Sequence, residues 1–243
     1  MACGEYGEGK MTEPQNIINN ILNYFENLRK NKKLKALVTA GPTQEKIDPV
    51  RFISNKSSGK QGYEIANSLK NNGFETTLIS GPTNLKPISG INLINVNTAE
   101  EMLNKCLDCL PVDIAIFTAA VADYKVKNFY EQKIKKRENL NLDLEQNVDI
   151  LKHISNHNSL RPKLVIGFAA ETNNLKKNSI EKLSEKNCDW IISNDVSNPE
   201  IGFNSENNKV SIFYKNKVEE NLPKMSKSAV ANEIVNKIIS DFN

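Results

Sequence analysis

Small, hydroxyl-bearing and basic residues follow the first apolar segment of the chain at a spacing suited to an anion. Ala40-Gly41-Pro42-Thr43 comes directly after that segment, and residues 51–60 then bring Asn55 and Ser57-Ser58-Gly59 before an amphipathic stretch. If this run joins a strand to a helix, its backbone N–H groups and hydroxyls face the helix N-terminus, where anions bind. It is not a Walker A loop, because Gln61 stands where a Ser or Thr would bind the metal. A phosphate site at residues 57–59 and an ordinary N-capped helix both stay open on the residues alone.

Two later groups of residues also follow buried segments. Ala119-Ala120-Val121-Ala122-Asp123 is a small-residue turn, so a ligand can approach its backbone, and Asp123 could hold a ribose, a base or a magnesium ion. Residues 167–172, which include Phe168, follow another buried segment, and Lys182 and Lys186 lie one helical turn apart on one face. The alternatives are a tight loop with a solvated carboxylate and a pair of solvated helix lysines.

Residues 124–140 form a basic stretch with few apolar residues. It holds Lys125, Lys127, Lys133, Lys135, Lys136 and Arg137. Its position soon after a predicted strand indicates a mobile basic loop at the ligand-binding edge.

The hydrophobic pattern predicts the scaffold that positions these groups. From residue 34 onward short apolar runs alternate with amphipathic ones, as in a parallel sheet covered by helices. We expect an α/β fold with a Rossmann-like, doubly wound, mostly parallel sheet, helices on both faces and ligands at the carboxyl ends of the strands. The expected strands are residues 35–39, 76–80, 93–96, 113–118, 164–168 and 190–193, with an antiparallel edge strand at 210–214. The expected helices are residues 17–28, 58–71, 99–110, 148–156, 174–186 and 227–241, with Thr98 and Ser226 as N-caps.

Composition excludes several classes. The chain has 243 residues, 39% of them hydrophobic and 25% charged, a balance typical of globular proteins rather than disordered ones. The net charge of +3 is too small to indicate nucleic acid, and no apolar run is long enough to span a membrane or to form a secretion signal. We therefore expect a cytoplasmic protein. Cys106 and Cys109 have a Cys-x-x-Cys spacing without a second ligand pair, so buried thiols are favoured and any metal site is unknown.

The order and spacing of the motifs together resemble those of the phosphopantothenoylcysteine synthetases. The opening signature is carried by Gly41-Pro42-Thr43, Asp48-Pro49-Val50-Arg51, Ser54-Asn55 and Ser57-Ser58-Gly59-Lys60. Residues 119–124, 133–136, 147–150 and 167–172 resemble later blocks of the same family in the same order, so the resemblance covers about residues 34–241. It implies a Rossmann-like fold, a homodimer, magnesium and CTP as a co-substrate. Val126 and Val148 depart from the family, which usually has prolines there.

The resemblance also implies roles for individual residues. It implies that Asn55 and Lys133 are catalytic and that Arg51, Ala119 and Ala120 lie near the acyl substrate. Gly41, Ser57, Ser58 and Gly59 form the expected phosphate loop. The residues that it places around CTP are Asp123, Lys133, Asn147, Val148, Asp149, Ile150, Phe168, Lys182 and Lys186.

The N-terminal residues resemble a different enzyme. Ala2-Cys3-Gly4 with Gly7, Gly9-Lys10-Met11 and Glu13-Pro14 is similar to the last segment of phosphopantothenoylcysteine decarboxylases, in which the residue matching Cys3 is the active-site acid. We expect residues 1–14 to be a remnant of a decarboxylase substrate flap, 15–33 a linker helix and 34–243 the ligase domain. FMN would bind only to a preceding domain, in a bifunctional parent enzyme.

The reaction implied by the resemblance joins 4'-phosphopantothenate to cysteine with CTP, through an acyl-cytidylate. Two other classes were weighed from the residues. A nucleotide-binding Rossmann oxidoreductase would need an acidic residue closing the second strand, where Ser80-Gly81-Pro82 stands instead. A nucleic-acid module would need more aromatic residues in the basic loop than Tyr124, Phe129 and Tyr130. We expect small-molecule partners, with no nucleic acid and no membrane.

Overall fold

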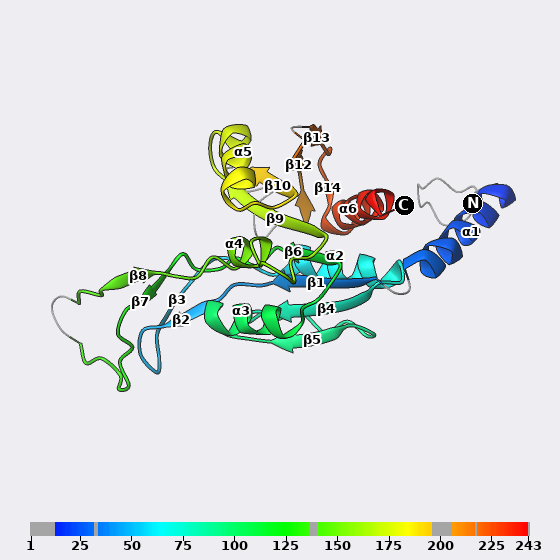
Figure 1. The fold of residues 1–243 in the computed structure, drawn as a ribbon. Helices are drawn as coiled ribbons and strands as arrows, with labels where there is room; N and C mark the ends of the chain where they lie inside the picture. Colours follow the sequence, from blue (N-terminus) through cyan, green and yellow to red (C-terminus); the bar gives the residue numbers. More distant parts are fainter. Residues whose placement is uncertain (1–12, 32–33, 137–139, 196–205, 217, 243) are drawn as a thin grey trace, which may run out of the picture.

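A central sheet organises the protein, whose computed structural model describes residues 13–31, 34–136, 140–195, 206–216 and 218–242 (Figure 1). The sheet has eight strands in the order β13-β12-β10-β9-β6-β1-β4-β5. The strands are β1 (Lys35–Ala40), β4 (Glu75–Ser80), β5 (Asn92–Asn95), β6 (Ile114–Phe117), β9 (Leu164–Glu171), β10 (Trp190–Asp195), β12 (Val210–Tyr214) and β13 (Glu219–Asn221).

Six neighbouring strands of the sheet, in the spatial order β5-β4-β1-β6-β9-β10, are all parallel. Numbered along the chain, their spatial order is 3-2-1-4-5-6, which is the doubly wound Rossmann order. The chain therefore reverses its direction of winding between β1 and β6. In such sheets a ligand crevice forms at this point, outside the carboxyl ends of the strands.

Helices cover both faces of the sheet. Alternate residues of β1 point to opposite faces: Ala36 and Val38 pack with α2 (Lys60–Asn71) and α6 (Lys227–Asp241), and Leu37 packs on the other side. That second face is covered by α3 (Ala99–Asp108), α4 (Ile150–Ser155) and α5 (Leu175–Glu185). The expected two-faced architecture is confirmed.

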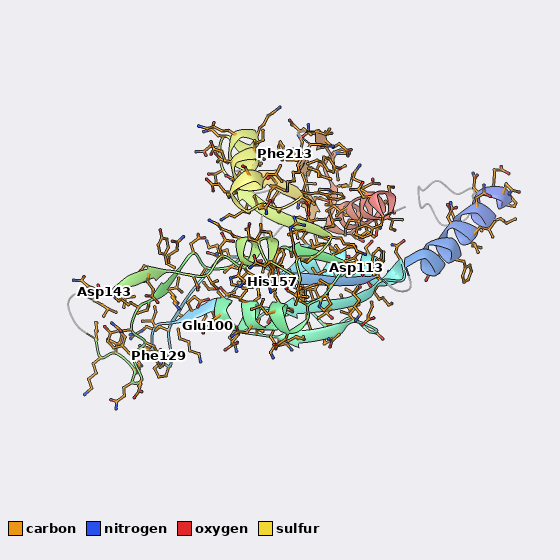
Figure 2. All side chains as sticks on the ribbon, viewed as in Figure 1. Glu100, Asp113, Phe129, Asp143, His157 and Phe213 are labelled. Carbon is orange, nitrogen blue, oxygen red and sulfur yellow. The ribbon has the colours of Figure 1, made fainter. Side chains whose placement is uncertain are left out.

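Two antiparallel hairpins form an arm that extends from the carboxyl edge of the sheet, at the left of Figure 1. One joins β2 (Gln44–Lys46) to β3 (Phe52–Ser54), and the other joins β7 (Tyr124–Val126) to β8 (Leu144–Gln146). Figure 2 shows Phe129 and Asp143 on this arm, whereas Asp113 lies toward the other end of the sheet. Helix α1 (Pro14–Asn31) projects at that other end, and a short pair of strands, β11 (Asn207–Asn208) and β14 (Met225–Ser226), precedes α6.

Three expectations need correction. Residues 124–140 are not a loop throughout, because β7 opens the stretch and pairs with β8. The strand at 210–214 is antiparallel as expected but does not lie at the edge, because β13 pairs with its other side. Helix α2 begins at Lys60 rather than at residue 58. Among the described residues, none of the helices has both the length and the apolar character needed to cross a membrane.

Candidate functional site

A pocket of about 540 Å³ lies at the carboxyl ends of the central strands, at the switch between β1 and β6. The segment before α2 and the turn after β6 form one part of its wall, and residues of α2, α4, α5, β9 and β10 with the start of α6 form most of the rest. The lining residues are 55–62, 117–123, 146–151 and 168–170, with Thr39, Lys182, Lys186, Ile191, Asn194, Asn208 and Lys227.

The pocket brings together most of the residues that the sequence analysis selected. The lining includes Asn55, Ser57, Ser58, Gly59, Ala119, Ala120, Asp123, Asn147, Val148, Asp149, Ile150, Phe168, Lys182 and Lys186. Gly41, Arg51 and Lys133 are not among the lining residues. Cys3 lies outside the described residues.

Hydrogen bonds hold the small-residue turn after β6 against the loop after β1. The backbone N–H of Ala120 donates to the Gly41 carbonyl oxygen at 2.9 Å, and that of Ala122 donates to Thr43 Oγ1 at 3.0 Å. Asn55 Nδ2 donates to the Val121 carbonyl oxygen at 2.9 Å. The Asn55 amide is therefore fixed beside the turn that contains Ala119 and Ala120, and the Gly41 carbonyl holds the same turn by accepting from Ala120.

The N-terminus of α2 opens onto the pocket. Its N-cap, Gly59, has a φ of 73°, which favours glycine, and Ser57 Oγ accepts a hydrogen bond from the Gly59 N–H at 3.2 Å. A Cβ at Gly62 would lie 2.3 Å from Thr118 Oγ1, so glycine at this position lets the first turn approach β6 closely. N–H groups of a first helical turn have no partner inside the helix, so they face this end.

Asn147 presents a buried donor. The residue is 9% exposed. Its side-chain Oδ1 accepts from the Val148 N–H at 2.9 Å, and its backbone N–H donates to the Asp123 carbonyl oxygen at 2.8 Å. The first of these bonds sets the orientation of the amide, and Nδ2 then has no hydrogen-bond partner among the described residues. A buried donor left without a partner costs about 1–3 kcal/mol. A ligand acceptor in the pocket would remove that cost.

Both helix lysines of the sequence analysis are held on carboxylates. Lys182 Nζ lies 2.6 Å from Glu171 Oε1, and Lys186 pairs with Asp149. Asp149 also caps α4, because its side chain accepts from the Lys152 N–H at 2.9 Å. The two lysines are therefore positioned in the pocket wall rather than simply solvated.

Several polar residues of the lining had no predicted role, among them Lys60, Gln61, Asn208 and Lys227. Lys60 and Lys227 are the first residues of α2 and α6, and neither helix has an acidic residue in its first turn. Cations are disfavoured there by the helix dipole, which was the signal available in the sequence. Lys227 is 5% exposed. Burial and then the Lys60 charge lower the pKa of Lys227, while Glu206 acts in the opposite direction.

Arg51 and Lys133 lie on the arm. The Arg51 guanidinium lies 3.0 Å from the Asp48 carboxylate and donates to the Ile134 carbonyl oxygen at 3.3 Å. Asp48 also accepts from the Ile134 N–H, so the hairpin loop holds the start of the basic loop. Burial raises the pKa of Asp48, but the N–H groups of Val50, Ile134 and Arg51 lower it more, so the carboxyl stays ionised. Lys133, next to Ile134, is exposed.

Magnesium was expected from the resemblance. Within the described ranges there is no group of three or more His, Cys, Asp or Glu side chains placed to hold a metal. Asp123 lines the pocket and offers one carboxylate to it. A single pocket carboxylate would suit magnesium that is bound together with phosphate groups of a ligand, because Mg²⁺ usually keeps waters and phosphate ligands.

The fold and the pocket define a class: a Rossmann-like α/β protein with a ligand site at the switch point, walled by lysines and by a helix N-terminus. Within this class, residues 31–242 match the model of the family described as DNA/pantothenate metabolism flavoprotein C-terminal domain. The chain belongs to this family.

Curated relatives and solved structures agree with this assignment. The chain is 41% identical over 243 residues to the coenzyme A biosynthesis bifunctional protein CoaBC of Haemophilus influenzae, covering 99% of this chain and 60% of that protein. It is 39% identical over 243 residues to the Bacillus subtilis protein of the same name, covering 98% and 59%. The crystal structure of the C-terminal domain of a CoaBC protein superposes with a TM-score of 0.73 at 40% identity, covering 87% of this chain and 96% of that one. The chain thus spans about three fifths of the curated relatives it matches.

Proposed function

We propose that this chain is a phosphopantothenate-cysteine ligase that uses CTP in coenzyme A biosynthesis. The observation that supports this most is the convergence in one pocket of Asn55, Ala119-Ala120, Asp123, residues 147–150, Lys182 of α5 and the α5 C-cap Lys186. These groups are far apart in the chain, and the family resemblance implied that they act in one reaction. Membership of the family and the names of the relatives support the same role.

The proposed reaction has two balanced steps. A carboxylate oxygen of 4'-phosphopantothenate attacks the α-phosphorus of CTP, and pyrophosphate leaves. The cysteine amine then attacks the acyl carbon, the bond from that carbon to the CMP oxygen breaks, and the amine loses a proton. Lys182 and Lys186 would hold triphosphate oxygens, and Asn55 would orient the acyl group through its fixed amide. Magnesium bound with the triphosphate would neutralise part of its charge.

Cytosine is the base that we assign to the Asn147 region. The free Nδ2 donor needs an acceptor, and cytosine offers its O2 and N3. Phe168 lines the same pocket and offers an apolar ring. Asn147→Ala should therefore weaken CTP binding by about tenfold or more, because it removes a buried hydrogen bond.

Lys133 can contact the reacting groups only after a change in the position of the arm or in a complex with a second subunit. It lies on the arm and outside the pocket lining, so the arm must close on the pocket or reach the pocket of a second subunit. We favour a homodimer, because an arm that projects from the body offers its edge strands to another copy. A flavin-containing decarboxylase domain ahead of this chain, acting with Cys3, belongs to the same proposal.

The experiment that tests this function mixes the purified chain with 4'-phosphopantothenate, cysteine, magnesium and CTP. Mass spectrometry should find phosphopantothenoylcysteine, with one CMP and one pyrophosphate for each product molecule. Asn147→Ala with its raised requirement for CTP serves as the matched variant. Absence of the amide product from the folded wild-type protein would refute the proposal.

A further inference from the structure

One peptide unit in the turn after β6 is bound from both sides by side chains that flank the β2–β3 hairpin. Thr43 Oγ1 accepts from the Ala122 N–H at 3.0 Å, and Asn55 Nδ2 donates to the Val121 carbonyl oxygen at 2.9 Å. These two backbone groups belong to the same peptide bond, which joins Val121 to Ala122. Because a peptide unit is planar, the Thr43 hydroxyl fixes the direction of the carbonyl that Asn55 binds.

A further hydrogen bond closes these contacts into a ring. Ser54 Oγ donates to the Thr43 carbonyl oxygen at 2.7 Å, and Ser54 is the residue before Asn55. Thr43 directly precedes β2 and Asn55 directly follows β3, so the pairing of these strands brings the two ends of the hairpin together. The Thr43 N–H also donates to the Ala120 carbonyl oxygen at 3.3 Å. Thr43 therefore holds the turn at two places.

Thr43 lies inside the protein, whereas the groups that it holds lie at the pocket. Thr43 is 0% exposed and Ala122 is 2% exposed. Water has little access to their hydrogen bond, and a buried N–H that loses its acceptor is costly. Asn55 and residues 119–123 line the pocket, but Thr43 is not among the lining residues. Thr43 can therefore act on a ligand only through Asn55 and the turn.

We propose that Thr43 is a positioning residue for the acyl-transfer step, in which the cysteine amine displaces CMP. The assignment rests on the proposed function, in which Asn55 orients the acyl group. The Thr43 hydroxyl keeps the Val121–Ala122 peptide in the orientation in which its carbonyl accepts from Asn55. The direction of the Asn55 amide should matter more when the amine attacks the acyl carbon than when the carboxylate attacks phosphorus.

Thr43→Val tests this assignment, because valine keeps the branched shape of threonine but offers no acceptor. Rapid-quench kinetics measure pyrophosphate release and amide formation in the same reaction mixture. We expect amide formation to fall about tenfold and pyrophosphate release to change by less than about twofold. Thr43→Ser keeps the acceptor oxygen and should form the amide at a rate within about threefold of wild type.

A double variant shows whether Thr43 acts through Asn55. Asn55→Ala already removes the amide group that the Val121 carbonyl holds. Adding Thr43→Val to Asn55→Ala should therefore slow amide formation by less than about a further twofold. Losses that multiply as for independent residues would overturn the assignment.

Amide hydrogen exchange tests the geometry without any substrate. The Ala122 N–H should exchange slowly in wild type and in Thr43→Ser, and about tenfold or more faster in Thr43→Val. Equally slow exchange in Thr43→Val would show that the hydroxyl does not hold this peptide and would overturn the assignment.

Two further variants serve as a second test and a matched control. Ser54 is exposed, so Ser54→Ala opens the ring with little risk to the fold and should lower amide formation selectively. It decides the matter if Thr43→Val does not fold. Thr76 is 4% exposed and lies near the amino end of β4, away from the pocket, where its Oγ1 donates to the Phe74 carbonyl oxygen at 3.2 Å. Thr76→Val should leave the ratio of the two rates as in wild type.

The outcomes separate this assignment from the function on which it rests. Equal losses of pyrophosphate release and amide formation in Thr43→Val, or wild-type rates in both, would overturn the assignment alone. A wild-type protein that forms no amide product would refute the proposed function, and the assignment with it. Exchange of the Ala122 N–H does not depend on that function.

Discussion

The Asp48 carboxylate accepts a hydrogen bond from the backbone N–H of Ile134 at 3.1 Å, across 86 positions of the chain. Its side chain is fully buried, and it also accepts from the N–H groups of Val50 and Arg51, both at 2.8 Å. Asp48 therefore ties the β2–β3 hairpin to the basic loop at the residue that follows Lys133.

Asp48→Asn should loosen the basic loop and lower turnover. Oδ1 accepts from the backbone N–H groups of Val50 and Arg51, whereas Oδ2 accepts from the Ile134 N–H and the Arg51 guanidinium. The amide has only one acceptor oxygen and no charge, so it loses one of these two sets of contacts and, in either orientation, the ion pair with Arg51. We expect faster amide hydrogen exchange at residues 130–136 and a lower rate of pyrophosphate release. Asp143→Asn, on the same arm and exposed, is the control. Wild-type exchange at residues 130–136 in Asp48→Asn would show that the carboxylate does not hold the loop.

Lys133→Gln should reduce acyl-cytidylate formation by about 10² to 10³ in rate, whereas Lys136→Gln should change turnover only a few-fold. The two lysines are both exposed in the same loop, so general electrostatics predicts similar effects. Only a side chain that reaches the α-phosphate produces the difference. Pyrophosphate release from each variant decides between the two accounts, and small, similar losses would remove Lys133 from the catalytic residues.

Asn55→Ala should separate the two half-reactions. The Asn55 amide is fixed on the Val121 carbonyl oxygen beside the turn that we assign to the acyl group, so it should matter more for amine attack than for nucleotidyl transfer. We expect pyrophosphate release to continue while acyl-cytidylate accumulates and amide formation falls by roughly 10² or more. Rapid-quench analysis measures both steps. Equal losses in both would indicate a binding or structural role.

Asp113 should stabilise the fold down to acidic pH. Its carboxylate accepts from the Lys35 N–H and from Lys163 Nζ, both at 2.9 Å. Burial raises the pKa of Asp113, but these two donors lower it by more than burial raises it. The pKa of the folded protein therefore lies below the ordinary 3.8. The stabilisation is therefore complete above the unfolded-state pKa and is lost as the pH falls through the lower folded-state value.

Asp113→Asn should lower the unfolding temperature by about 2–4 °C at pH 7, equivalent to roughly 1 kcal/mol. Thermal unfolding between pH 2 and pH 7, on the order of one unit per step, should show the difference shrinking only below the ordinary carboxyl pKa. Asp108→Asn removes an exposed pair with Lys105 and should have little effect. A difference that does not depend on pH would argue against this role.

The parallel sheet was predictable because its strands are short apolar runs between amphipathic helices. Residues 35–39 and 190–193, for example, fall within β1 and β10. The capping signals were also local: Thr98 Oγ1 accepts from the Glu101 N–H at 3.2 Å, and Ser226 Oγ from that of Ala229 at 3.1 Å. Each of these features depends on neighbours in the sequence.

The arm was not predictable in the same way. Gln44–Lys46 and Leu144–Gln146 are short and mostly polar, and they form strands only because partners from the same loops lie alongside. For the site, the family resemblance implied roles for most pocket residues but none for Lys60 or Lys227, which lie in one pocket because α2 and α6 meet in space. The helix-dipole rule marked both positions, but it does not by itself identify a ligand.

The central claim is that the acyl carboxylate attacks the α-phosphorus of CTP, and an oxygen label tests it most directly. The chain is supplied with 4'-phosphopantothenate carrying ¹⁸O in its carboxylate, together with cysteine, magnesium and CTP. The account predicts that each CMP released carries one ¹⁸O, because the carboxylate oxygen stays on phosphorus when the amine displaces CMP. Unlabelled CMP, or ¹⁸O in inorganic phosphate with CDP as the other product, would contradict it.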